Sequence, residues 1–189
     1  MTILHPDGYQ DSFITIRYLR QMLPEYEKLL KSAVEKKKEN RSFFEKLKKI
    51  PGRDLDALFN DLHEEAFEKV DCLKCANCCK TTGPLLKNKD IDRLSEHLRI
   101  KPAKFVSESL RIDEDNDYVF KKMPCPFLKD DNYCSVYSAR PKACREYPHT
   151  DQRNIRSILP ITFLNSMICP AVALIVEELK VEVNSLGQR

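Results

Sequence analysis

Four cysteines stand within eight consecutive residues of this chain, and their spacing suits a metal ion. They are Cys72, Cys75, Cys78 and Cys79, in the pattern Cys-x2-Cys-x2-Cys-Cys. Two residues between ligands let one tight turn aim two thiolates at a single ion, and two successive steps aim three. A tetrahedral zinc ion or a cubane cluster then needs a further ligand from elsewhere. Adjacent side chains tend to diverge, so we expect Cys78 and Cys79 to serve different metal centres, or one of them to be a spare.

Four single cysteines follow the cluster and bring the total to eight: Cys125, Cys134, Cys144 and Cys169. Eight thiolates would fill two four-thiolate sites, so all eight are candidate metal ligands. The first three lie in short polar segments, where a core residue is less needed. Cys169 stands beside apolar residues and suits a core position equally well. We expect the first three to complete the site, because their closeness in sequence lets one folded loop deliver them.

The spacing leaves the metal and the number of centres open. Cys72, Cys75 and Cys78 match the first three ligands of a bacterial ferredoxin cluster, whose cysteine motif ends in Cys-Pro. Here the Cys-Pro pairs are Cys125-Pro126 and Cys169-Pro170, in distant segments. Zinc sites more often use two separated Cys-x2-Cys pairs, although thiolates suit both metals. We therefore predict an iron–sulfur cluster or zinc, in one or two centres. A disulfide framework is disfavoured, because no export signal accompanies the cysteines.

Two arginines, Arg140 and Arg145, flank Cys144. A centre with four thiolates is anionic, so nearby guanidinium groups would stabilise it and could receive an anionic ligand. We predict that they support the centre without binding the metal; the alternative is a solvated pair of charges. His149 is an alternative ligand, although a lone histidine is more often a surface residue.

Helical periodicity dominates both ends of the chain. Pro24 can begin a helix, because proline is tolerated in a first turn, and Pro51-Gly52 is a break. Between residues 55 and 70 apolar side chains recur at helical spacing. The apolar segment from Ala171 to Leu179 reads as a final core helix.

The middle of the chain reads as short elements. Residues 102–110 suit a short helix, residues 118–120 a short strand, and the segment from 125 to 137 a small hairpin. We predict a mainly α fold with a small cysteine-rich metal-binding module and a minor β-hairpin, α+β at most. The predicted domains are a helical N-terminal extension, residues 1–70, and a cysteine-cluster metal-binding domain with a C-terminal helix, residues 71–189.

Composition indicates a soluble globular protein, with 42% hydrophobic and 32% charged residues. No run of about 18 apolar residues exists, so we expect no membrane span. The N-terminus has neither a basic start nor an apolar segment of a secretory signal, which favours the cytosol, where thiols persist. A net charge of +3 is too small to imply nucleic acid by itself.

The later cysteines stand in short motifs of their own. Taken in order, the motifs are Cys72-x2-Cys75-x2-Cys78-Cys79, Cys125-Pro126-Phe127-Leu128, Cys134-Ser135-Val136-Tyr137, Arg140-Pro141, Cys144-Arg145-Glu146-Tyr147-Pro148 and Cys169-Pro170. This order and spacing resembles the YkgJ-like cysteine-cluster family, over about Asp71 to Pro170. That family is described as a zinc- or iron-chelating domain with a CxxCxxCC signature, so the resemblance implies a metal centre held by the matching cysteines. Ala76 stands where the family has glycine, which questions the local backbone geometry.

Metal binding is the predicted function, and two uses of it stay open. The flagellin lysine N-methylases carry a similar cluster, which makes a redox or methyl-transfer role conceivable, as in a redox or cluster-dependent enzyme, although the chain shows no Gly-rich cofactor loop. The alternative is a structural zinc module whose basic helices bind a protein or nucleic-acid partner. The basic stretch from Lys36 to Lys49 includes Phe43 and Phe44 and could contact nucleic acid. A solvated helix face is the favoured interpretation of this stretch.

Overall fold

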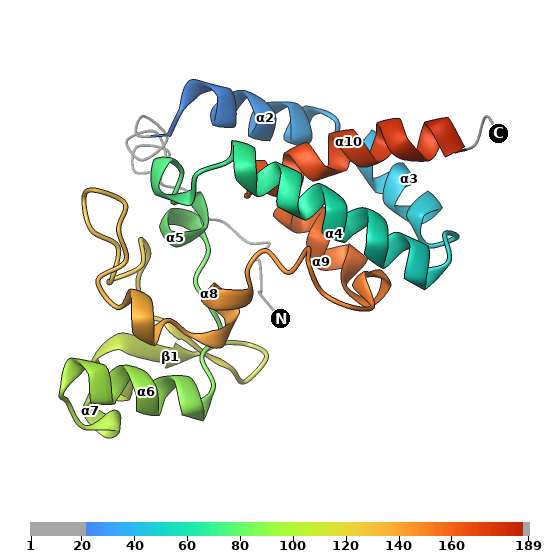
Figure 1. The fold of residues 1–189 in the computed structure, drawn as a ribbon. Helices are drawn as coiled ribbons and strands as arrows, with labels where there is room; N and C mark the ends of the chain where they lie inside the picture. The colour runs from blue at the N-terminus through green and yellow to red at the C-terminus, as the bar shows by residue number, and fades with distance from the viewer. Residues whose placement is uncertain (1–21, 187–189) are drawn as a thin grey trace. The chain divides into compact units, whose positions relative to one another are not determined.

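The chain folds into two compact units, which we describe separately. The computed structural model describes residues 22–186 and is mainly helical, with one two-stranded sheet among these residues, as predicted from the sequence (Figure 1). The helical unit contains residues 22–75 and 148–186, and the inserted unit contains Ala76–Tyr147. The predicted division at residue 70 stays a prediction about domains. The part of the predicted N-terminal extension before residue 22 lies outside the described residues.

The helical unit consists of seven helical elements. They are α2 (Pro24–Glu35), α3 (Lys37–Leu47), α4 (Gly52–Lys69), the 3-10 turn η1 (Cys72–Lys74), η3 (Ile155–Ile158), α9 (Leu159–Asn165) and α10 (Pro170–Leu186). Pro24 begins α2 and Pro51 precedes α4, which confirms both sequence signals. None of the described helices alone is long and apolar enough to cross a membrane. The helical segments at 155–165 and 170–185 pass a test of length and composition only as a pair, bent by 117°.

The core of the helical unit forms around α10. Its buried side chains are Ala171, Val172, Ala173, Ile175, Val176 and Leu179. Both α4 and α2 pack against this helix (Figure 1). The apolar face of α4 is fully covered by this packing; it consists of Leu55, Phe59, Leu62 and Ala66, at the helical spacing seen in the sequence.

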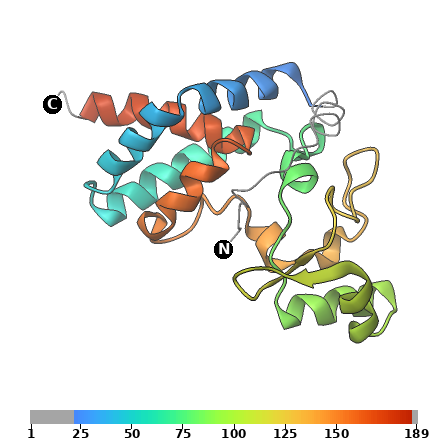
Figure 2. The same ribbon diagram turned by 180° about the vertical axis from the view of Figure 1, so that it is seen from behind.

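The basic helix α3 uses its aromatic side chains for packing. Phe43 and Phe44 are both buried, and the Phe44 ring meets Phe163 of α9 edge to face, with centroids 5.5 Å apart. Figure 2 shows α3 and α9 from behind, on the same side of the helical unit. Lys36, at the start of this stretch, forms an ion pair of 2.8 Å with Glu177 of α10. The aromatic rings are therefore not available for stacking on nucleic-acid bases.

The inserted unit contains short elements around a second core. They are α5 (Asn77–Thr81), α6 (Asn88–Leu98), α7 (Pro102–Ser109), β1 (Leu110–Ile112), β2 (Tyr118–Phe120), η2 (Tyr137–Ala139) and α8 (Lys142–Glu146). β1 and β2 are antiparallel, with Arg111 opposite Val119. The core residues are Leu86, Ile91, Leu94, Phe105, Leu110, Phe120, Val136 and Ala139. Cys125, Phe127 and Cys134 pack against this core from a loop, so two of the cysteines are tied to it.

Candidate metal centre

A backbone hydrogen bond connects the cysteine cluster to the first of the remote cysteines. The N–H of Cys125 donates to the carbonyl of Cys79 at 2.8 Å. Cys79 lies in the short helix α5, and 46 residues separate the two positions in sequence. The fold of the inserted unit therefore brings the backbone of Cys125 beside that of Cys79.

A small turn structure then holds Cys134 opposite Leu128, three residues after Cys125. The N–H of Leu128 donates to the Cys125 carbonyl at 3.0 Å, and an isolated antiparallel bridge pairs Leu128 with Cys134. The N–H of Ser135 donates to the Phe127 carbonyl at 2.8 Å, which joins the same two stretches of chain a second time. The predicted hairpin between residues 125 and 137 is thus present as a single bridge, too short to count as a regular sheet.

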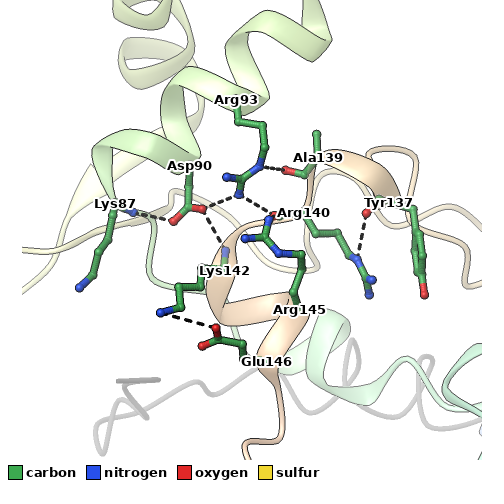
Figure 3. Close-up of polar contacts among 9 residues, drawn as sticks. All are labelled: Lys87, Asp90, Arg93, Tyr137, Ala139, Arg140, Lys142, Arg145 and Glu146. Carbon is green, nitrogen blue, oxygen red and sulfur yellow. Dashed lines mark hydrogen bonds and ion pairs between the residues drawn. The ribbon is translucent and has the colours of Figure 1, made fainter.

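The third remote cysteine, Cys144, lies in α8, a helix of five residues. The segment that leads into it is held by side chains of α6. The Asp90 carboxylate accepts the N–H of Lys142 at 2.9 Å, and an Nη of Arg93 donates to the carbonyl of Arg140 at 2.7 Å (Figure 3). Arg145 also donates to the Arg140 carbonyl, at 2.6 Å. The position of Cys144 is therefore set by contacts from outside its own helix.

The thiols of the inserted unit differ strongly in acidity. The pKa of Cys79 is lowered to about 7, mainly because the Cys78 side chain hydrogen-bonds to it. Burial opposes this shift, and the charges of Arg140 and buried Lys80 add to it. The expectation that Cys78 and Cys79 diverge is therefore wrong, since their side chains are in hydrogen-bond contact. The Cys79 thiol therefore loses its proton more readily than an ordinary cysteine.

Burial has the opposite effect on the remote cysteines of this unit. It raises the pKa of Cys125 to about 12 and also raises the pKa values of Cys134 and Cys144. Negative charge on Cys79 raises all three values further, and Cys144 also responds to Cys125 and Cys134. The charge of Arg140 lowers the pKa values of Cys134 and Cys144. These four thiols are thus close enough for their charges to interact.

The other three cysteines belong to the helical unit. Cys72 and Cys75 stand at the two ends of the η1 turn, where the N–H of Cys75 donates to the Cys72 carbonyl at 3.1 Å. Cys169 immediately precedes α10, and its N–H donates to the Asn165 carbonyl at 2.8 Å. Burial raises the pKa of the Cys169 thiol to about 12, and charges on Cys75 and Cys72 raise it further. The interacting thiols of this unit are therefore Cys72, Cys75 and Cys169.

The start of η1 is anchored by a tyrosine of α2. The hydroxyl oxygen of Tyr26 accepts the N–H of Asp71 at 2.9 Å, and the Asp71 carboxylate accepts the N–H of Leu73 at 2.9 Å. Cys72 is exposed, whereas Cys75 is buried. After Cys75 the chain passes through Ala76 in the left-handed conformation, with φ 50° and ψ 20°.

This arrangement of cysteines coincides with a family match. Residues 71–162 match the model of the family described as "CxxCxxCC: Putative zinc- or iron-chelating domain". These residues belong to the CxxCxxCC family. Comparisons with curated proteins and with solved structures found no match. The CxxCxxCC domain contains seven of the eight cysteines, and Cys169 lies beyond its end. The family resemblance predicted from the sequence is thereby confirmed.

The eight predicted ligands fall into two groups, one in each unit. No disulfide joins any of the eight cysteines. Between residues 22 and 186, no three His, Cys, Asp or Glu side chains stand in an arrangement that could hold a metal ion. His149 belongs to the helical unit, where its ring nitrogen contacts the Gln152 amide at 2.9 Å. The assignment of all eight cysteines as ligands stays a prediction.

Nothing in the sequence indicated that Asp90 and Arg93 hold the 139–142 segment of the CxxCxxCC domain. Asp90 and Arg93 were visible only as an i,i+3 pair near the start of a helix, a spacing that many exposed helices share. Their backbone partners lie 46 to 52 residues further along the chain. A local sequence pattern cannot predict hydrogen bonds between residues so far apart in the chain. Buried Lys80 has no separate signal either, because it looks like any lysine in a polar turn.

Proposed function

We propose that this protein binds zinc or iron through cysteine thiolates, with one set of ligands in the inserted unit: Cys79, Cys125, Cys134 and Cys144. The observation that carries the proposal is the hydrogen bond from the Cys125 N–H to the Cys79 carbonyl, which brings a remote cysteine to the cluster. Four thiols are the donor set that tetrahedral zinc and iron–sulfur clusters use. Three of these thiols stay protonated at neutral pH when no metal ion is bound. A coordinated cation deprotonates its thiol ligands, so these donors suit zinc or iron by their chemistry. Because no three of the described side chains stand in a metal-holding arrangement, metal binding must also draw the thiols together.

A second set of ligands is proposed in the helical unit, where Cys72, Cys75 and Cys169 interact. The eight cysteines then serve two centres, and Cys78 acts as the hydrogen-bond donor to Cys79 or as a further ligand. Arg140 offsets negative charge on the thiolates of the inserted unit. Arg145 acts indirectly, through the carbonyl of Arg140. We propose a reducing compartment, the cytosol, because the centre needs its thiols unpaired.

Two uses of the centre are compatible with this donor set. Zinc bound by four thiolates is typical of a structural site, whereas an iron–sulfur cluster supplies electron transfer or cluster-dependent catalysis. The contribution of the chain is the same in both cases: it positions four thiols, shields three of them by burial and places the Arg140 cation beside them. The burial of Phe43 and Phe44 disfavours the variant in which the basic helices bind nucleic acid by stacking.

Anaerobic purification of the full-length protein tests the proposal directly. Metal and acid-labile sulfide analysis, together with the visible absorbance, separates a brown iron–sulfur protein from a colourless zinc protein. Cys134→Ser should lose metal from the inserted unit. Ser135→Ala, which removes a neighbouring hydroxyl that hydrogen-bonds the Phe127 carbonyl at 3.1 Å, is the matched control and should retain the metal. Equal metal content in wild type and Cys134→Ser would contradict the proposed ligand set.

A further inference from the structure

Asp90 is a buried carboxylate, near the start of α6, that makes three polar contacts. Only 3% of the residue is exposed. One carboxylate oxygen accepts the N–H of Lys87 at 3.1 Å. The other accepts the N–H of Lys142 at 2.9 Å and faces an Nη of Arg93 at 2.5 Å (Figure 3). These contacts lower the pKa of Asp90 against the opposing effect of burial, so the group is ionised at neutral pH. Asp90 therefore joins α6 to the first residue of α8.

Arg93 extends the same connection along the backbone. Besides contacting Asp90, its guanidinium donates to the carbonyl of Ala139 at 3.3 Å and to the carbonyl of Arg140 at 2.7 Å. Figure 3 shows the Arg93 side chain reaching from α6 to the two consecutive peptide groups. The planar guanidinium suits this task, because it presents several N–H donors in a fixed geometry. Together, the two α6 side chains hold residues 139, 140 and 142.

The segment held in this way carries the Arg140 guanidinium, and Cys144 follows shortly after it. The guanidinium of Arg140 lies 3.6 Å from the centre of the Tyr137 ring, and its Nε donates to the Tyr137 carbonyl at 3.0 Å. Its charge acts on the thiols of Cys79, Cys134 and Cys144. Cys144 follows two residues after Lys142, in the same short helix.

The segment has little structure of its own to fix these groups. η2 has three residues and α8 has five, and helices this short are not stable without tertiary contacts. The contacts from α6 therefore restrain the backbone that carries the Cys144 thiol and the Arg140 guanidinium. A ligand that is already positioned does not have to be ordered when the metal binds.

We propose that Asp90 and Arg93 are positioning residues of the metal centre: they hold the 139–142 segment, and with it Cys144 and Arg140, in place for metal binding. The inference rests on the proposed function. Neither residue contacts a thiol, so their effect on the metal is transmitted through the backbone of this segment. Partners outside the ligand set typically change metal affinity about 10- to 100-fold when removed.

The test compares two substitutions that remove the same kind of contact. In Asp90→Asn the carboxylate that accepts the Lys142 N–H loses its charge and one acceptor oxygen. Asp56→Asn is the matched control, because the Asp56 carboxylate also accepts two backbone N–H groups, from Asn154 at 2.8 Å and Ile155 at 2.9 Å. All of its partners belong to the helical unit. Zinc affinity of the full-length proteins is measured by competition with a chromophoric chelator, and unfolding by urea on the same samples.

We expect Asp90→Asn to weaken zinc binding to the inserted unit about 10- to 100-fold. Asp56→Asn should leave the zinc affinity unchanged, although it lowers the free energy of unfolding by a similar amount. Arg93→Lys and Arg93→Met provide a second series in case Asp90→Asn does not fold. Lysine keeps the charge but cannot bridge the same three acceptors, so zinc affinity should fall in the order wild type, lysine, methionine. Cobalt(II) substitution should show altered thiolate-to-metal absorbance in the methionine variant.

Equal zinc affinities in wild type, Asp90→Asn and Arg93→Met, with lower stability in the variants, would overturn the inference, because the pair would then be structural only. Failure of the proposed function looks different, since the wild-type protein itself would then bind neither zinc nor cobalt. The Cys134→Ser variant, which removes a proposed ligand, provides the reference for complete loss of the centre in the inserted unit.

Discussion

The substitution Ala76→Gly tests the backbone geometry at the centre of the cysteine cluster. Ala76 lies between Cys75 and α5 with φ 50°, a conformation that costs a residue with a Cβ about 1–2 kcal/mol. Glycine removes this strain. Two costs oppose the gain: glycine is freer in the unfolded chain, by about 0.4–1 kcal/mol, and a buried methyl group contributes about 0.8 kcal/mol. We therefore expect Ala76→Gly to change the free energy of unfolding by less than about 1 kcal/mol.

A second alanine supplies the reference. Ala66 is buried to a similar degree in the middle of α4, where glycine relieves no strain. Ala66→Gly should therefore cost about 2 kcal/mol, from helix propensity and the lost methyl group. The difference between the two variants, about 1–2 kcal/mol, isolates the left-handed strain. Urea unfolding of the full-length proteins measures it. Equal losses in the two variants would refute the argument.

Three further predictions concern the rest of the chain. Glu177→Gln should lower the free energy of unfolding by less than about 1 kcal/mol near neutral pH, because its ion pairs with Lys36 and Lys180 are partly exposed. The pairs hold the pKa of Glu177 below its usual value, so the difference between variant and wild type should be present above about pH 4.5 and disappear as the pH falls through the lowered pKa, in pH-dependent urea unfolding. Phe44→Ala should cost about 3–5 kcal/mol in the same assay, because it empties a buried site against Phe163; a loss under about 1 kcal/mol would contradict the packing. A chelator should lower the thermal midpoint of the metal-loaded wild type far more than that of Cys134→Ser, measured by circular dichroism, since metal binding is coupled to folding.

The helices were the part of the fold that the sequence predicted well. Helical spacing of apolar residues predicted the buried face of α4, which consists of Leu55, Phe59, Leu62 and Ala66. The apolar segment after Pro170 predicted a core helix, and both helices were confirmed. Local signals are sufficient here, because a long helix repeats the same pattern several times. Three-residue strands carry no such repetition. The strand at residues 118–120 was predicted, whereas its partner at Leu110–Ile112 was not, since Leu110 was expected to end a helix.

The sequence indicated which residues are candidate ligands, but it did not indicate how the cysteines divide between the two units. Metal-ligand spacing indicated the cluster, and that the later cysteines complete a metal site with it stays a prediction. Tertiary contacts decide which cysteines lie near one another. Cys169 comes after α9 and belongs to the helical unit, whereas the segment that carries Cys144 is held by α6 of the inserted unit. The hydrogen bond between the Cys78 and Cys79 side chains was also not expected, because neighbouring side chains tend to diverge.

The position of Ala76–Tyr147 inside the sequence of the helical unit has a consequence for the order of folding. If these 72 residues were unstructured while α4 and α10 packed, they would form a loop with both ends fixed. Closing such a loop costs roughly 4 kcal/mol, taken as 1.5RT times the logarithm of its length. A segment that folds first on its own replaces this flexible loop by one body with defined ends. Whatever stabilises the inserted segment, bound metal included, then also lowers the entropic cost of assembling the helices on either side of it.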